Sequence, residues 1–139
     1  MIKEKQIAIG LVMKDGVLLM LERKDENPMW DHKWEFPGGK IEAGEEPHRA
    51  VCREILEETG LAVELPELLG VHSHDWNLPD DNVLRVHLHC FLCTTVSNEV
   101  RREVDHSYSH VWIDPKTIDA WDLLEANADL TKALLWPRL

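Results

Sequence analysis

Three glutamates in the first half of the chain have a spacing that suits metal-dependent chemistry. Glu54, Glu57 and Glu58 stand at positions i, i+3 and i+4, so on a helix their carboxylates share one face. Like charges at this spacing weaken an isolated helix by roughly 0.2–0.5 kcal/mol per pair, and a bound cation would remove the repulsion. Carboxylate oxygens favour magnesium, which also takes phosphate oxygens as ligands. The alternative interpretation is a solvated acidic face.

The residues around these acids predict the helix that carries them. Pro47 suits a first helical position, because it has no N–H group to leave unpaired. Gly60 suits the end of the helix, because glycine adopts the left-handed conformation without penalty. Between them, Ala50, Val51 and Ile55 recur at helical spacing and form a stripe that is expected to be buried.

A glycine-rich segment, a glutamate and an arginine accompany the acids at fixed distances. Five residues separate Gly39 from Glu45, and seven separate Glu45 from Arg53. The whole segment resembles the Nudix hydrolase box, and it matches that box at Gly39, Glu45, Arg53, Glu54, Ile55, Glu57, Glu58, Gly60 and Leu61. The preceding residues, Trp34 to Lys40, resemble the MutT-type branch of the family.

This resemblance implies hydrolysis of a nucleoside diphosphate linked to another group, with magnesium or manganese as cofactor. It assigns the backbone carbonyl of Gly38 and the carboxylates of Glu54 and Glu58 to the metal, with Glu57 as a further ligand or as the group that aligns water. Arg53 is expected to pair with a carboxylate of the box and fix its rotamer. The expected catalytic residues are therefore Glu57, Glu54 and Arg53, and the expected metal ligands are Gly38, Glu54, Glu57 and Glu58.

The general base is the least determined of these roles. A carboxylate must take a proton from the attacking water. Members of this family use either a glutamate of the box or an acid on a late loop, where this chain has Glu99, Glu103 and Asp105, followed by His106. Glu57 is the first choice.

Substrate contacts are also expected from the resemblance. Phe36 and Asn127 match positions that contact the base in MutT-type enzymes, although Phe36 could equally be a core residue and Asn127 a helix cap. The remaining expected substrate contacts are Arg23, Glu35, Pro37 and Gly38, and position alone would make Arg23 an ordinary surface cation. The turn Leu78-Pro79-Asp80-Asp81 has an acid where MutT carries an arginine that contacts the base, which leaves specificity for oxidised guanine open.

Composition limits the class of partner. With 15 Lys and Arg against 26 Asp and Glu, the formal net charge is −11, and no basic cluster is present to bind long nucleic acid. A small nucleotide is the expected partner.

The three cysteines are too few for a disulfide framework. The sequence shows neither a signal peptide nor an apolar run of the roughly 18 residues that a membrane span needs. We expect one cytoplasmic domain over residues 1–139, as a monomer or, as often in this family, a homodimer.

The rest of the chain predicts a mixed sheet. Residues 6–13 and 17–21 read as a hairpin around Asp15-Gly16, and residues 22–33 as a loop. Strands are expected at 61–76 (irregular at Pro66), 83–96 and 110–113, with a turn at 77–82 and a loop at 97–106. A short helical turn follows at 114–115, and a last helix, capped by Asn127, would bury Leu130, Ala133 and Leu134. This order does not alternate as βαβ units, so the fold class is α/β with helices on both sides, and the resemblance implies the Nudix α/β/α sandwich.

Two further patterns lie on the predicted strands. Cys90 and Cys93 are three residues apart and point to opposite faces of a strand, so they read as core residues and not as a metal pair. If the turn is centred between Asp80 and Asp81, His74 would lie opposite His87, and the histidine two residues before His74 would lie opposite the one two residues after His87. The four would then form one patch, which could line the substrate pocket or bind a transition metal. These are His72, His74, His87 and His89. The alternative is that they are half-exposed surface residues.

The sequence favours one reaction and leaves two alternatives. The favoured reaction is hydrolysis of a nucleoside triphosphate, canonical or damaged, to the monophosphate and pyrophosphate. A nucleotide-sugar, ADP-ribose or dinucleotide hydrolase is the alternative within the enzyme class. A catalytically silent nucleotide-binding module is the alternative outside it, and such a module would be expected to have lost one of the three glutamates, all of which are present.

Overall fold

A computed structural model describes residues 1–138 of the chain, apart from the side chain of Leu65. Leu139, the last residue of the predicted domain, lies outside the described residues. The strands are β1 (Ile2–Lys14), β2 (Val17–Arg23), β3 (Trp34–Glu35), β4 (Gly38–Lys40), β5 (Glu64–Asn77), β6 (Val83–Thr94) and β7 (Ser107–Ile113). The α-helices are α1 (Pro47–Thr59) and α2 (Glu125–Leu130), and short 3₁₀ or π turns occupy Pro79–Asp81, Pro115–Ala120, Thr131–Leu135 and Trp136–Arg138.

Within residues 1–138 the seven strands form one mixed sheet. Its order is β3-β2-β1-β6-β5, with β4 added on β1 and β7 on β2. The long strand β1 runs parallel to β6 and antiparallel to β2 and β4. Because β1 pairs with β4 at its centre, it fixes the glycines of β4 beside Glu54 and Glu58 in the second half of α1.

The predicted hairpin and central helix are confirmed. Asp15 and Gly16 both have positive φ, as a tight two-residue hairpin turn requires. Helix α1 begins at Pro47 and ends at Thr59, and Gly60 closes it with φ 74°. The irregular start of β5 is also present, as register shifts between Glu64 and Glu67 and before Gly70.

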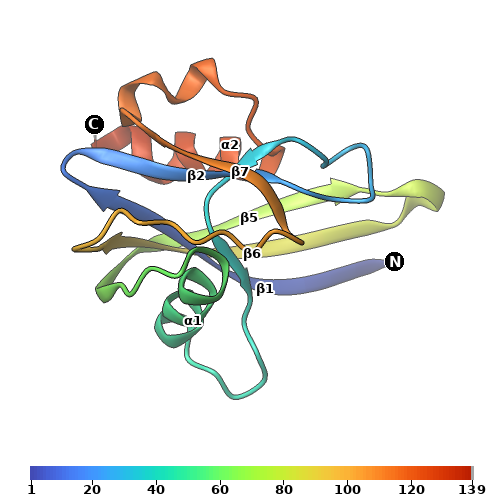
Figure 1. Cartoon of the computed structure of the whole chain (residues 1–139). Coiled ribbons are helices and arrows are strands. Elements are labelled where there is room, and N and C mark those ends of the chain that lie inside the picture. Colours follow the sequence, from blue (N-terminus) through green and yellow to red (C-terminus); the bar gives the residue numbers. More distant parts are fainter. Residues whose placement is uncertain (139) are drawn as a thin grey trace.

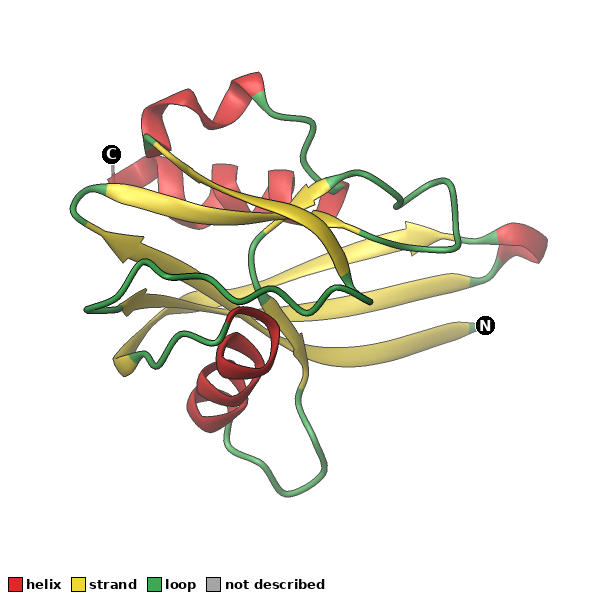
Figure 2. Cartoon of the chain, viewed as in Figure 1, coloured by secondary structure: helices red, strands yellow, loops and turns green. Residues whose placement is uncertain are grey.

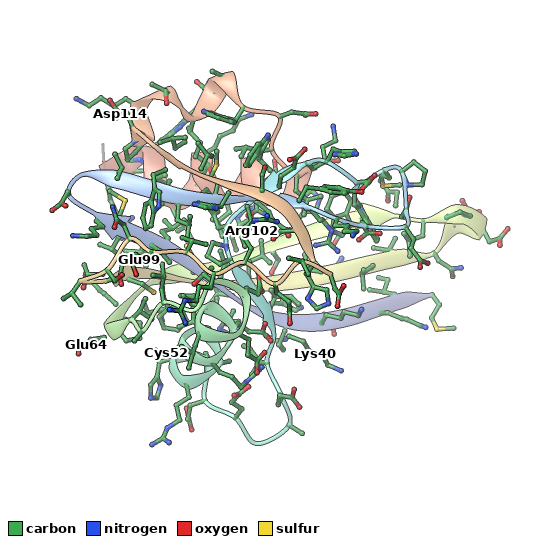
Figure 3. The ribbon with its side chains drawn as sticks, in the orientation of Figure 1. Lys40, Cys52, Glu64, Glu99, Arg102 and Asp114 are labelled. Atoms are coloured by element: carbon green, nitrogen blue, oxygen red, sulfur yellow. The ribbon has the colours of Figure 1, made fainter. Side chains whose placement is uncertain are left out.

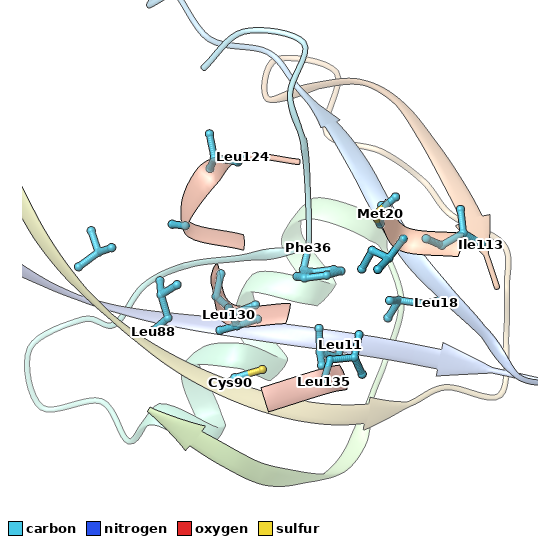
Figure 4. Packing of buried hydrophobic residues seen from close by; sticks show 14 of the residues in the cluster. Leu11, Leu18, Met20, Phe36, Leu88, Cys90, Ile113, Leu124, Leu130 and Leu135 are labelled. Atoms are coloured by element: carbon cyan, nitrogen blue, oxygen red, sulfur yellow. The ribbon is translucent and has the colours of Figure 1, made fainter. Parts of the chain in front are cut away.

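Helices cover both faces of the sheet (Figures 1 and 2). Helix α1 packs on one face through Ala50, Val51 and Ile55, the stripe expected from the sequence. Helix α2 and the C-terminal turns lie on the other face, over a cluster that includes Phe36, Leu88 and Leu130 (Figure 4). The α/β sandwich with a mixed sheet is therefore the observed fold.

The two strand cysteines separate as predicted. Cys90 belongs to the core under α2 and Cys93 to the core under α1. Burial raises the pKa of both thiols to about 12, so both stay protonated and unreactive at neutral pH.

The last helix differs from its prediction. Asn127 is the third residue of α2 and does not cap it, because the helix begins two residues earlier, after Leu124. A π turn at 131–135 then adds a residue to the helical repeat, so Leu130 and Leu135 are buried while Ala133 is exposed.

The predicted four-histidine patch is wrong. The loop between β5 and β6 has five residues, 78–82, and is centred on Asp80, which takes the left-handed conformation together with Asp81. His74 therefore lies opposite Val86 and not His87. A slip of one residue exchanges the faces of a strand, so His87 and His89 lie on the face opposite to His74.

Candidate active site

Two glycines of β4 lie directly against the acids of α1. The Gly38 N–H group donates a hydrogen bond to Oε1 of Glu58 over 3.3 Å. A Cβ atom placed on Gly39 would stand only 2.5 Å from Cδ of Glu54, closer than nonbonded carbons approach. The absence of side chains on β4 thus allows both carboxylates to reach the backbone.

The carboxylates in this region crowd one another. Burial, and then the negative charges of Glu35 and Glu54, raise the pKa of Glu58 well above its usual value of 4.5. Burial also raises the pKa of Glu35, although the guanidinium of Arg23 opposes this. Such shifts mark a place where negative charge is costly unless a cation is present.

Arg53 organises the surrounding acids as expected. Its guanidinium donates two hydrogen bonds to Glu45, over 2.8 and 2.9 Å, and one to Glu54 over 2.9 Å. It also donates to the carbonyl of Lys40 over 3.1 Å. Hydrogen bonds from Arg53 lower the pKa of Glu45 to about 2. Glu57 is 52% exposed and touches Arg53 only at 3.3 Å, so its carboxylate remains available to solvent.

The described side chains do not form a preformed chelating cluster. Among residues 1–138, no group of three or more His, Cys, Asp or Glu side chains converges as ligands of one ion. Gly38, Glu54 and Glu58 are brought together, but Glu57 faces Arg53 and water. A hard cation at this position would therefore draw on two carboxylates and backbone or external oxygens, a common arrangement for magnesium.

A cavity of about 310 Å³ adjoins the glycines. Its wall includes five of the six expected substrate contacts, namely Arg23, Glu35, Phe36, Gly38 and Asn127. Pro37 does not line it, and instead its carbonyl accepts a hydrogen bond from the Gly10 N–H group over 2.9 Å. The other lining residues are Lys5, Ile7, Ile9, Trp30, Gly39, Trp76, Leu84, Val86, Leu88, Leu124 and Ala126.

Sequence reasoning missed the aromatic part of this wall. Trp30 and Trp76 pack edge to face with ring centroids 5.5 Å apart, and one comes from the loop after β2 while the other lies on β5. A partial signal was available, because Leu84, Val86 and Leu88 alternate on β6 and had to share one face. Which residues pack on that face of β6 depends on how the strands pair, and the local sequence does not show this.

Asn127 fixes the backbone at Phe36. The Phe36 N–H group donates to Oδ1 of Asn127 over 2.9 Å. Because Oδ1 is used as an acceptor, the amide NH₂ group of Asn127 is the part left to interact at the cavity. The Phe36 side chain is 2% exposed and belongs to the core, so it forms the floor of the cavity.

Arg23 is held at the cavity and is not an ordinary surface cation. Its guanidinium pairs with Glu35 at 3.0 Å and with Asp25 at 2.7 Å. It also lies 5.8 Å from the ring centre of Trp30, within the range of a cation–π contact. One cation therefore stands between the buried acid and the aromatic wall.

The loop between β6 and β7 approaches the acids through its backbone. The Glu103 N–H group donates to the carbonyl of Glu58 over 3.0 Å, and Glu103 pairs with His106. Figure 3 labels Arg102 and Glu99 of the same loop. The Arg102 guanidinium donates to the carbonyl of Ser107 over 2.7 Å. Glu99 and Asp105 are exposed, so Glu103 is the acid of this loop that is tied to the site.

None of the helices within residues 1–138 combines the length and the apolar character needed to cross a bilayer.

Part of this chain is similar to two enzymes of known activity. An 8-oxo-dGTP diphosphatase of Escherichia coli is 42% identical over 81 residues, which are 58% of this chain and 61% of the relative. An ADP-ribose pyrophosphatase of Methanocaldococcus jannaschii is 36% identical over 92 residues, which are 66% of this chain and 52% of that protein. The aligned segment thus spans less than two thirds of each relative's length.

The likeness extends over the whole fold in a solved structure. The crystal structure of a MutT NUDIX hydrolase from Burkholderia pseudomallei is 27% identical, covers 94% of this chain and 97% of its own, and superposes with a TM-score of 0.74. A family profile described as "NUDIX domain" matches residues 4–134. Because this profile covers most of the chain, and the box runs from β4 through the following loop and α1 to Leu61, this chain belongs to the Nudix family.

Proposed function

We propose that this protein is a magnesium-dependent hydrolase that converts a nucleoside triphosphate, canonical or damaged, to the monophosphate and pyrophosphate. The observation that carries the proposal is the contact of Gly38 and Gly39 with Glu58 and Glu54 at the edge of the cavity. A cavity for an aromatic base beside a cluster of acids is what a metal-assisted attack on a phosphate requires.

The residues present fit a divalent cation. Glu54, Glu58 and the Gly38 carbonyl would hold it, with Glu57 able to join from its exposed position. The raised pKa of Glu58 supports this assignment, because a cation would relieve the repulsion that raises it. A bound magnesium or manganese ion supplies charge neutralisation on phosphate and a lowered pKa of water.

The chain's own residues would then orient the reaction. Arg53 fixes the rotamer of Glu54 through the hydrogen bond of 2.9 Å. Glu57 is the proposed general base, because it is the exposed carboxylate of the box and can accept a proton from water. Glu103, tied to Glu58 by its backbone, is the alternative base.

Recognition of the nucleotide is assigned to the cavity wall. Phe36 provides an apolar floor, and the NH₂ group of Asn127 can donate to an acceptor on the base. Arg23, oriented by Glu35, is placed to donate to a phosphate oxygen. Pro37 acts only indirectly, by anchoring this segment to β1 through Gly10.

Hydrolysis of ADP-ribose or a related diphosphate is the second candidate. It is supported by the 36% identity to the archaeal ADP-ribose pyrophosphatase. A nucleotide-binding module without catalysis is the third, and the complete set of box carboxylates argues against it.

The decisive experiment measures product release by the purified chain. Pyrophosphate and monophosphate would be followed with a panel of triphosphates, 8-oxo-dGTP and ADP-ribose, with magnesium and with a chelator. Glu54→Gln and Glu58→Gln should each lose most of the activity. Glu46→Gln, an exposed neighbour without a side-chain hydrogen bond at the start of α1, is the matched control. Equal turnover by wild type and both variants would reject the proposed metal site.

We propose that residues 1–139 act as one domain in a reducing cytoplasm, where the three cysteines, all free in the structure, would stay reduced. Homodimerisation remains a prediction, and analytical ultracentrifugation would test it.

A further inference from the structure

A buried histidine lies between β5 and α2, behind the cavity wall. The His74 side chain is 5% exposed, and its Nδ1 lies 2.5 Å from Oδ2 of Asp129 on α2. A carboxylate only accepts hydrogen bonds, so Nδ1 carries the donated proton. Nε2 has no hydrogen-bond partner among the described residues. The distance from Nε2 to Oε1 of Glu125 is 3.8 Å.

The helix held by this contact forms one side of the cavity. Leu124, Ala126 and Asn127 line the cavity, and Asn127 receives the hydrogen bond from Phe36. Asp129 follows Asn127 by two residues, on the side of α2 that meets β5. Helix α2 has only six residues, too few to be rigid without tertiary contacts. Its position therefore depends on the contacts that anchor it.

The same histidine supports a second side of the cavity. Its ring packs edge to face on Trp76, with centroids 4.8 Å apart, and Trp76 packs on Trp30. Both tryptophans line the cavity, and Arg23 lies over Trp30. One imidazole thus touches the α2 wall through a hydrogen bond and the aromatic wall through a ring contact.

We propose that His74 is a positioning residue for nucleotide recognition, acting with Asp129. The pair sets where α2 places the NH₂ group of Asn127 and supports Trp76 from behind. His74 contacts none of the residues assigned to the metal or to phosphate, so it acts on binding and not on the chemical step. This inference rests on the proposed function, because it assigns the cavity to the nucleotide.

The test replaces the hydrogen bond while keeping the ring. In His74→Phe the ring can still pack on Trp76, but no donor faces Asp129, which is 42% exposed and can be solvated instead. Loss of one such hydrogen bond should raise KM for the best nucleotide about threefold to tenfold and leave kcat within about twofold. His74→Asn, whose amide can donate from the position of Nδ1, should recover most of the affinity.

Two controls separate positioning from general damage. His72→Phe changes the same face of β5 at a histidine that makes no hydrogen bond within the described residues, and should leave KM unchanged. Asp129→Ala removes the contact from a partly exposed helix position, so it remains informative if His74→Phe fails to fold. It should reproduce the rise in KM, and the effects of His74→Phe and Asp129→Ala should not add.

The possible results divide clearly. Unchanged KM in folded His74→Phe or in Asp129→Ala would overturn the inference, as would a loss confined to kcat. Failure of His74→Asn to improve on His74→Phe would also overturn it, because the donor would then be irrelevant. Absence of hydrolysis by the wild-type chain would instead reject the proposed function, and quenching of tryptophan fluorescence by a nucleotide monophosphate would then still measure the effect of His74 on binding.

Discussion

The contact between Gly39 and Glu54 predicts a substitution that separates activity from stability. In Gly39→Ala the new Cβ atom would stand 2.5 Å from Cδ and 2.6 Å from the nearer oxygen of Glu54. Gly39 does not have a positive φ, so alanine imposes no backbone strain there. The atom that must move is the end of a flexible side chain, and Glu54 is expected to rotate away from β4.

The free energy of unfolding should change little. Turning Glu54 off its rotamer costs about 0.5–1.5 kcal/mol. Disturbing its partly buried pair with Arg53 adds about 1 kcal/mol. Replacing glycine by alanine in a compatible conformation returns about 0.4–1 kcal/mol through the unfolded state. The net loss should therefore stay near 1 kcal/mol, whereas moving a catalytic group by about 1 Å costs roughly 100-fold in rate.

Gly38→Ala provides the contrasting variant. Its Cβ would stand 2.2 Å from the carbonyl oxygen of Ala8 and 3.0 Å from Cα of Ile9, so the β1 backbone itself would have to move. We expect a loss of about 1–3 kcal/mol or more in stability. Urea unfolding and magnesium-dependent turnover, measured on both variants, check the comparison. Full activity in Gly39→Ala, or unfolding as severe as in Gly38→Ala, would refute the placement of Glu54 against β4.

Three other predictions follow from single contacts. The pKa of Glu58 is raised in the folded state, so its contribution to stability is full below the unfolded pKa and is lost as pH rises through the folded value. As pH rises above the ordinary range of a glutamate, the Tm of the metal-free protein should thus fall by more than that of Glu58→Gln. Calorimetry will show equal slopes of Tm against pH for the two proteins if the shift is absent. Arg53→Lys keeps the charge but loses the two-bond contact with Glu45, and should lower kcat about tenfold or more; unchanged kinetics would argue against its orienting role. Asn127→Leu leaves the buried Phe36 N–H group unpaired, which should cost about 1–3 kcal/mol in chemical denaturation and raise KM, and a neutral result would mean that the backbone finds another acceptor.

The residues of α1 show how far local rules reach. Pro47 and Gly60 bound the helix because each satisfies a backbone requirement that no distant contact changes. That Arg53 pairs with a carboxylate of the box was expected from the resemblance, and the structure shows Glu45 and Glu54 as its partners. The separation of Cys90 and Cys93 followed from strand geometry alone.

Contacts between residues that are distant along the chain could not be predicted from local rules. The predicted pairing of the histidines was wrong because the loop between β5 and β6 is centred on Asp80 and not between Asp80 and Asp81. Both aspartates adopt the left-handed conformation there, and nothing in the local sequence requires it of Asp80. The sequence suggests that Asn127 could cap a helix. In the structure it lies inside α2, and its Oδ1 accepts a hydrogen bond from the Phe36 N–H group, which is distant along the chain. The tryptophans that form the cavity wall come from separate elements.

The sequence by itself determined the acidic helix, its boundaries and the glycines before it, because these depend on backbone conformation and on spacing within one turn or two. Only the tertiary structure decided that Glu54 and Glu58 press against β4, that Arg23 faces a cavity and that His74 lies beneath α2. Those contacts join residues that are distant along the chain, and their existence depends on which strands pair and in which register.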